Sequence, residues 1–350
     1  MLLWASFSAS SETAIRIASY NVELTRDGPG LLLRDIRSGQ DAQADAVAAV
    51  IAHARPDVLV LQNVDFDFEL QALHVLQDLS ASKGHAMPFA FALRPNTGLM
   101  SEFDLDGDGR TGTPRDAQGF GEFSGQGGMA VLSRYPIAAD MAQDFSRLLW
   151  KDLPDATPPH TQHGPFPSSA AQDAQMLADV GHWVVPIMIG DQRLDVLTFH
   201  ANPPVFDGAE DRNGRRNHDQ MLFWQHFLNG TFGLAPDTNF VLIGNANIDP
   251  AKGEGRKGAI HGLLSDPRLQ DPVPAAIVGL DENDESIVET DTVEWPAPGP
   301  GKRRVSYALP SSDLRVTASG IFWPLGDTAI AKLARAASRH RLVWVDIVVE

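Results

Sequence analysis

Polar side chains follow several apolar runs of this sequence, at the point where each run stops. Asn21 follows IRIASY, Gln62 and Asn63 follow DVLVL, His200 follows DVLTF, and NFVLI leads into Gly244-Asn245-Ala246-Asn247. Amide and imidazole groups bind phosphate oxygens or cations, so these residue types in one place would suit phosphoryl or metal chemistry. A single polar residue after a strand is typical of a turn, so the inference depends on their convergence.

The apolar runs predict the strands that must position these groups. They lie at residues 15–22, 57–62, 129–133, 183–189, 194–199, 240–243, 305–309 and 342–349. Apolar residues at helical spacing predict helices at 41–55, with Asp41 as N-cap, and at 69–80, 215–229 and 327–338. Many strands with interspersed helices favour an α/β (α+β) fold, a four-layer sandwich of two packed mixed β-sheets flanked by helices.

The chain shows no linker between two separate cores, which predicts a single domain over residues 15–350. Insertions rich in Gly, Pro and Asp lie at 94–128, 152–180 and 271–303. Long loops of this kind are usually functional or disordered.

Composition narrows the classes of function. The 28 Lys and Arg residues face 45 Asp and Glu, for a net charge of −17. Such a surface repels polyanions and excludes a generic nucleic-acid-coating role, although a local basic groove stays open. The absence of cysteine excludes disulfides, thiol catalysis and thiolate metal sites.

The first 14 residues are apolar and then small, like the end of a signal peptide, but lack its positive start. We expect a periplasmic or secreted protein. The alternative is a cytoplasmic protein whose first residues form a disordered tail. No stretch is long and apolar enough to predict a membrane span, no protein partner is inferred, and a monomer is expected.

Residues 104–116 begin like an EF-hand calcium loop. Asp104, Asp106 and Asp108 occupy positions 1, 3 and 5, and a glycine follows at position 6. Position 12 falls on Arg115 where a glutamate is wanted, and Asp116 could close the shell instead. We expect Ca²⁺ in this loop, against the alternative of a solvated acidic turn.

Taken in chain order, the strand-end motifs resemble those of the deoxyribonuclease-I-like endonuclease/exonuclease/phosphatase family. The resemblance covers roughly residues 15–349 and includes Ser338-Arg339-His340 before the last apolar run. It implies hydrolysis of a phosphodiester or phosphomonoester with Mg²⁺ or Mn²⁺ at the active site. The substrate would be a phosphorylated small molecule or a short nucleic acid.

The resemblance also implies roles for single residues. Asn21 would hold the metal or a phosphate oxygen, and His200 and Asn247 would bind and polarise the phosphate. His340 would bind phosphate or activate water. The family has acids where this chain has other residues, namely Asn63, Asn245, Ser306 and Arg339.

These substitutions leave two interpretations open. An asparagine at 63 removes a formal charge from a Mg²⁺ ligand set, and Asn245 orients water without accepting its proton. Arg339 cannot support a histidine as a carboxylate does, but it suits a phosphate. The chain is either a divergent phosphoesterase that recruits nearby acids such as Asp65, Asp67 or Asp249, or an inactive relative acting as a calcium-stabilised binding protein.

The segment after His200 carries Arg212, Arg215 and Arg216. Arginine forms bidentate contacts with phosphate, so Arg212 and Arg216 are candidate substrate-binding residues, as is Arg339. The competing interpretation is that these arginines pair with Glu210 and Asp211 at a helix start.

Overall fold

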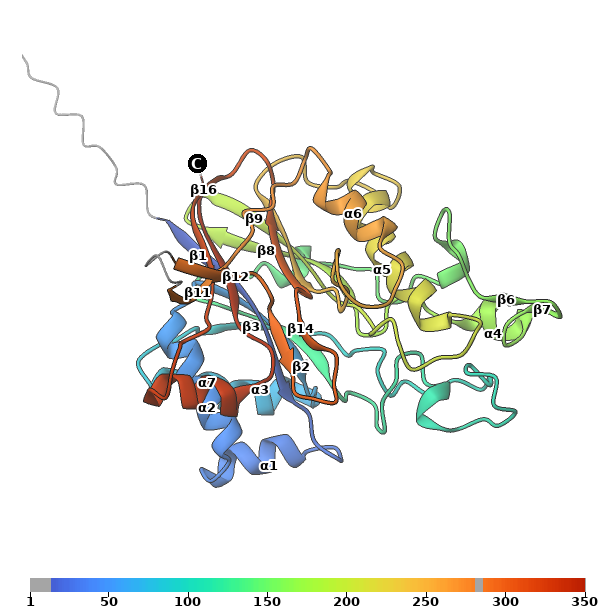
Figure 1. Cartoon of the computed structure of the whole chain (residues 1–350), viewed down its shortest axis with the longest axis horizontal. Helices are drawn as coiled ribbons and strands as arrows, with labels where there is room; N and C mark the ends of the chain where they lie inside the picture. Colours follow the sequence, from blue (N-terminus) through green and yellow to red (C-terminus); the bar gives the residue numbers. More distant parts are fainter. Residues whose placement is uncertain (1–13, 281–285, 350) are drawn as a thin grey trace, which may run out of the picture.

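Two mixed β-sheets packed face to face form the centre of the molecule (Figure 1). The computed structural model describes residues 14–280 and 286–349. The first sheet has the order β16–β17–β1–β2–β4–β3 and the second β15–β10–β9–β8–β5. The first is built from β1 (Ile15–Leu24), β2 (Val58–Val64), β3 (Phe89–Phe91), β4 (Gly128–Ser133), β16 (Arg315–Ile321) and β17 (Val343–Val348). The second is built from β5 (Gln143–Asp144), β8 (His182–Ile189), β9 (Gln192–His200), β10 (Phe240–Asn245) and β15 (Ser306–Pro310).

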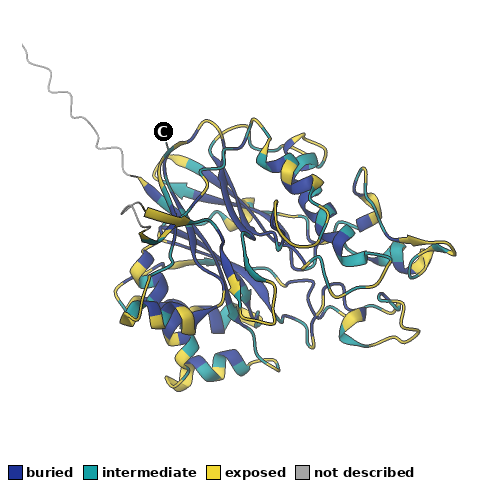
Figure 2. Ribbon diagram, in the orientation of Figure 1, coloured by how far each residue is buried: buried dark blue, intermediate teal, exposed yellow. Residues whose placement is uncertain are grey.

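The alternation of side chains along each central strand explains this packing. On β10, Val241 and Ile243 lie in the core between the sheets, whereas Phe240 and Leu242 lie in a second core under helices. Successive residues of a strand point to opposite faces, so a strand covered on both sides is apolar throughout. Figure 2 shows the resulting buried centre and the more exposed outer helices.

Helices cover the outer faces of both sheets (Figure 1). The first sheet carries α1 (Leu31–Ser38), α2 (Ala42–Ala54), α3 (Gln71–Ser82) and α7 (Ala329–Ala337). The second carries α5 (Arg212–Leu228) and α6 (Gly258–Leu264). The expected arrangement of two packed mixed sheets flanked by helices is confirmed.

Two elements escaped the sequence pattern for physical reasons. β16 is an edge strand with only two buried residues, Gly320 and Ile321, so it lacks a continuous apolar face. α1 lies between Gly30 and Gly39, both with positive φ, and buries only Leu32 and Ile36. Short elements with few buried residues give a weak periodic signal.

The three insertions contribute short elements. The first holds the 3-10 helix η2 (Pro114–Asp116), and the second holds β6 (His160–Thr161), β7 (Gly164–Pro165) and α4 (Ser169–Ala174). The third forms two hairpins, β11 (Ala276–Leu280) with β12 (Ser286–Glu289), and β13 (Val293–Trp295) with β14 (Gly301–Arg303). The remaining short elements are η1 (Phe68–Leu70), η3 (Ala139–Met141) and η4 (Trp150–Asp152).

Within residues 14–280 and 286–349, no helix is long and apolar enough to cross a membrane. The predicted signal remnant at 1–14 falls outside the described residues except for Ala14.

Candidate functional site

The strand faces that line the space between the two sheets change from apolar to polar at one end. On β10, the inward residues Val241 and Ile243 are followed by Asn245, and on β9 Val196 is followed by Thr198 and His200. We call the set of buried polar residues at this end the polar layer. Its members are Asn21, Gln62, His200, Asn245, Ser306 and His340.

Strand register brings three members of the polar layer side by side. Asn245 is the register partner of Ser306 on β15 and of His200 on β9. In the facing sheet Asn21 is the register partner of Gln62. In-register residues point to the same face of a sheet, so the predicted convergence of these strand ends agrees with the geometry.

Within residues 14–280 and 286–349, several buried atoms of the polar layer have no hydrogen-bond partner. They are Nδ1 of His200, Nδ1 of His340, Nδ2 of Asn245 and Oγ of Ser306. Buried polar groups are nearly always hydrogen-bonded, and leaving one unpaired costs roughly 1–3 kcal/mol. His200, Asn245 and Ser306 lie on adjacent strands, so one polar partner could satisfy several of these groups.

Burial keeps the two histidines of the polar layer neutral. Desolvation, with a smaller contribution from the nearby His340, lowers the pKa of His200 to about 3. Desolvation likewise lowers the pKa of His340 to about 4, although Glu23 favours its charged form. Both imidazoles are neutral near pH 7, so each offers one N–H donor and one acceptor nitrogen.

The loops behind the polar layer are fixed from α5. Nδ2 of Asn217 donates to the carbonyl oxygens of Asn202 and Ala246, both at 2.7 Å, and Asn217 is fully buried. Asn247 has a φ of 51°. Its backbone N–H donates to Oδ1 of Asn245, and its Nδ2 donates to the carbonyl oxygen of Ala201. The Asn247 side chain thus joins two site loops, a contact not anticipated from the sequence.

β-bulges turn two further side chains toward this end of the first sheet. The registers of β1 with β2 and of β2 with β4 both shift here, and Glu23 and Asn63 have φ values of 50° and 54°. Nδ2 of Asn63 donates to Oδ1 of Asn21 at 3.0 Å. Bulges redirect side chains, which explains why strict alternation does not describe these positions.

Glu23 is an acid at this end of the first sheet that the strand-end motifs did not predict. Its carboxylate accepts hydrogen bonds from the backbone N–H and the guanidinium of Arg339 and from the hydroxyl of Ser338. Desolvation alone would raise the pKa of Glu23, but the Arg339 contacts outweigh it and the pKa is lowered. Its position two residues after Asn21 was the sequence feature that could have placed Glu23 at the site.

A sequence model of the endonuclease/exonuclease/phosphatase family matches residues 18–340. The chain belongs to this family. The resemblance inferred from the strand-end motifs is therefore confirmed. Among proteins with curated descriptions, none matches this sequence.

Solved structures of family proteins share the fold at low identity. A protein from Leptotrichia buccalis C-1013-b is 18% identical, with a TM-score of 0.53, over 95% of this chain and 99% of the other. One from Beutenbergia cavernae DSM 12333 is 16% identical, with a TM-score of 0.55, over 96% of this chain and 72% of the other. Sphingomyelinase C from Streptomyces griseocarneus is 17% identical, with a TM-score of 0.50, over 95% of this chain and 99% of the other.

The residues present do not fit the divalent ion that the family resemblance implies. Oδ1 of Asn21 already accepts hydrogen bonds from Asn63 and from the backbone of Glu23. Asn63 presents its NH₂ group here, and Mg²⁺ requires oxygen ligands. Three or more His, Asp or Glu side chains whose ligand atoms lie within 4.8 Å of one another could hold a metal ion. Within the described part of the chain, no such group includes a member of the polar layer.

The acids proposed as replacements have structural partners. Asp67 accepts hydrogen bonds from the first amides of α3, and Asp249 accepts them from Ala251, Lys252 and Arg304. Asp65 accepts them from the amides of Arg26 and Gly127, while burial raises its pKa to about 6. These carboxylates order loops, which argues against their recruitment to a rebuilt metal site.

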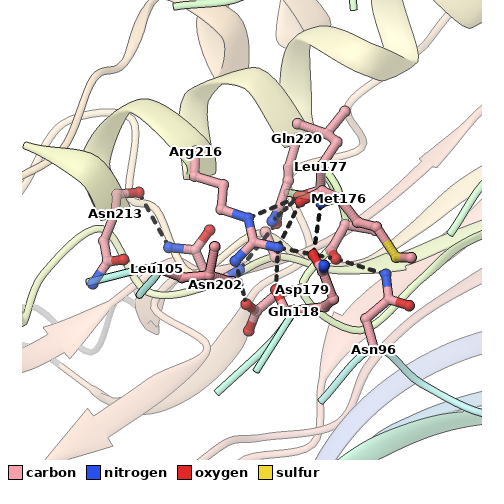
Figure 3. A network of polar contacts seen from close by, with 12 residues as sticks. Asn96, Leu105, Gln118, Met176, Leu177, Asp179, Asn202, Asn213, Arg216 and Gln220 are labelled. Atoms are coloured by element: carbon pink, nitrogen blue, oxygen red, sulfur yellow. Dashed lines mark hydrogen bonds and ion pairs between the residues drawn. The ribbon is translucent and has the colours of Figure 1, made fainter. Parts of the chain in front are cut away.

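Arg216 is buried inside a network of backbone carbonyls (Figure 3). Its guanidinium donates to the carbonyl oxygens of Gln118, Met176, Leu177 and Ala178 and to the carboxylate of Asp179. These contacts replace the substrate role that we expected for Arg216 with a structural one. They fasten the first two insertions to α5.

Arg212 is likewise engaged within the protein. Its guanidinium donates to the carbonyl oxygen of Leu105, inside the acidic loop, and lies near enough to Asp106 for the carboxylate to favour its charge. This contact uses one of the five guanidinium N–H donors, so the substrate contact of Arg212 stays a prediction.

The acidic loop brings three carboxylates together. One oxygen each of Asp104, Asp106 and Asp108 lies within 4.8 Å of the others. Asp116 does not join them, because its carboxylate accepts hydrogen bonds from the backbone of Leu105 and from Thr113. Arg115 lies 3.8 Å from Asp106, so a cation already faces the cluster.

Proposed function

We propose that this chain binds a phosphate ester at the polar layer and does not hydrolyse it with a divalent metal ion. The observation that carries the proposal is the set of buried, unpaired polar atoms on His200, Asn245, Ser306 and His340. Asn245 Nδ2 is a donor only, and the hydroxyl and the imidazoles can donate as well. A phosphate ester offers the acceptor oxygens that such a group of donors requires.

The charge of the site supports binding without this hydrolysis. Asn63, Asn245 and Ser306 are neutral where the family resemblance implies acids, and Glu23 is paired with Arg339. A divalent ion supplies most of the transition-state stabilisation in metal-dependent phosphoryl transfer. Without ligands for that ion, neutral donors bind a phosphate but leave the attacking water unactivated.

The test uses bis(p-nitrophenyl) phosphate, because one compound reports both binding and cleavage. We expect saturable binding by calorimetry in the presence of EDTA, and no nitrophenol release with Mg²⁺, Mn²⁺ or Ca²⁺. Asn245→Leu and His200→Ala should weaken binding by about tenfold each, the loss of one hydrogen bond to a charged group. Asn229→Ala, a change at an exposed residue outside the polar layer, is the matched control.

Metal-dependent phosphoester hydrolysis is the second candidate. Family membership over residues 18–340 and the placement of His200 beside Asn245 favour it. Nitrophenol release that needs a divalent ion and disappears in His200→Ala would establish this candidate and exclude the first. Absence of both binding and release would overturn both.

We also propose that Ca²⁺ binds the loop at 104–108 and orders the first insertion. The three converging carboxylates support this proposal, since a cation would relieve their mutual repulsion. Burial raises the pKa of Asp106, and the charge of Asp108 raises it further, so a bound cation would favour the ionised carboxylate.

A further inference from the structure

The carboxylate of Glu23 lies in a mostly buried position beside the polar layer. Only 17% of its side chain is exposed, and its charge interacts with His340. Its backbone N–H donates to Oδ1 of Asn21 at 3.3 Å, so the Glu23 backbone lies beside the Asn21 amide. Carboxylate oxygens are ligands for hard divalent cations.

Arg339 and its neighbour fill the acceptor positions of this carboxylate. Oε1 accepts from Nε at 2.8 Å and from Nη2 of Arg339, and Oε2 accepts from the Arg339 amide at 2.8 Å and from Oγ of Ser338 at 2.9 Å. An ionised carboxylate has about four lone-pair positions. The four donors therefore leave no position on Glu23 for a metal ion.

The two side chains of the ion pair differ in exposure. The Glu23 side chain is mostly buried beside the β1 bulge, whereas 56% of the Arg339 side chain is exposed to solvent. Removing the guanidinium would leave a carboxylate with two remaining donors, the Arg339 amide and the Ser338 hydroxyl. A partly buried charge without a counter-ion is unfavourable, so binding of another cation to Glu23 would become favourable.

We infer that Glu23 is the carboxylate of a latent divalent-cation site and that the Arg339 guanidinium occupies it as an internal cation. In the native chain, the arginine excludes Mg²⁺ and Mn²⁺ from the end of β1. Loss of its charge converts the same position into a metal site. This inference is independent of whether a phosphate ester binds at the polar layer.

The experiment measures Mn²⁺ binding in proteins that all carry Asp106→Ala, which removes the acidic loop as a competing site. Arg339→Ala and Arg339→Met are compared with the chain that keeps Arg339. Arg335→Ala is the matched control, because Arg335 also faces an acid, Asp327, at 3.8 Å on an exposed surface. Calorimetry gives the affinity, and paramagnetic broadening of the His340 imidazole signals locates the ion.

Both Arg339 variants should bind one Mn²⁺ about tenfold or more tightly than the chain that keeps Arg339, because a like charge has been removed. The ion should broaden the His340 signals, and Glu23→Gln added to either variant should abolish both effects. Equal affinity with and without Arg339, or a gain that survives Glu23→Gln, would overturn the inference. If the variants are unfolded without metal, refolding by Mn²⁺ supports the inference and failure to refold counts against it.

Discussion

Nδ2 of Asn63 donates a hydrogen bond to Oδ1 of Asn21 across the ends of β1 and β2. Two amides thus complete each other at a place where the family resemblance implies a metal-binding glutamate. The Asn63 side chain thus has a hydrogen-bond partner that requires no bound ion.

Restoring acids at this place should restore a metal requirement. We expect Asn63→Glu with Asn245→Asp to bind Mg²⁺ more tightly than the parent, because carboxylates replace amides. A Mg²⁺ concentration tenfold above the Kd would stabilise the fold by about 1.4 kcal/mol. Thermal unfolding with and without Mg²⁺, in the Asp106→Ala background, measures the effect. Asn63→Gln is the neutral control, and a Mg²⁺-insensitive midpoint in the acidic variant would contradict the prediction.

Acid should destabilise the protein through its buried histidines. Burial lowers the pKa values of His182 and His200 to about 3 and that of His340 to about 4. Above the unfolded pKa, near 6.5, imidazoles are neutral in both states and the stability is complete. As pH falls through 6.5 toward 4 or 3, the unfolded chain takes up protons that the folded chain excludes. At about pH 5, each of these histidines then lowers the free energy of unfolding by roughly 2 kcal/mol.

His182 allows this pH prediction to be tested away from the site. It stacks on Phe223 with a centroid distance of 4.6 Å, and neither ring nitrogen has a hydrogen-bond partner. In His182→Leu, unfolding should therefore take up one proton fewer. The free energy of unfolding should then fall less steeply as the pH drops below about 6.5. Urea denaturation at several pH values measures this. An unchanged slope would show that His182 is protonated equally in both states.

The Arg216 network should be a large contributor to stability. Arg216→Met removes the charge that faces Asp179 and unpairs several buried carbonyls, at a cost of about 3 kcal/mol. Asp179→Asn in the same chain should recover part of this loss, because the neutral amide needs no counter-charge. Chemical denaturation of the single and double variants measures the coupling. A cost no larger than that of Arg215→Met, whose guanidinium is only partly buried, would refute the assignment.

Chelation tests the acidic loop. If Ca²⁺ binds Asp104, Asp106 and Asp108, EDTA should lower the thermal midpoint of the native protein, and Asp106→Ala should abolish that shift. Asp78→Ala, at an exposed acid on α3, should leave the shift intact. A midpoint insensitive to EDTA would mean that Arg115, 3.8 Å from Asp106, suffices as the counter-ion.

The central strands and the main helices were predictable because their signals are local. Continuous apolar runs such as 240–243 become strands buried on both faces, and β10 extends this run to Asn245. The helix expected at 41–55 forms at Ala42–Ala54, with the side chain of Asp41 accepting a hydrogen bond from Ala44. The convergence of His200 and Asn245 also followed, since each lies where an apolar run ends.

Local sequence was thus enough to predict the central strands, the family and the residues that end these strands. The contacts of those residues depend on the tertiary structure. The pairing of Glu23 with Arg339 joins positions 316 residues apart through a bulge, and no local pattern encodes such a contact. The burial of Arg216 among carbonyls likewise depends on where two insertions meet α5. Periodicity specifies which face of an element is apolar, whereas the partner of a charged side chain depends on packing between distant segments.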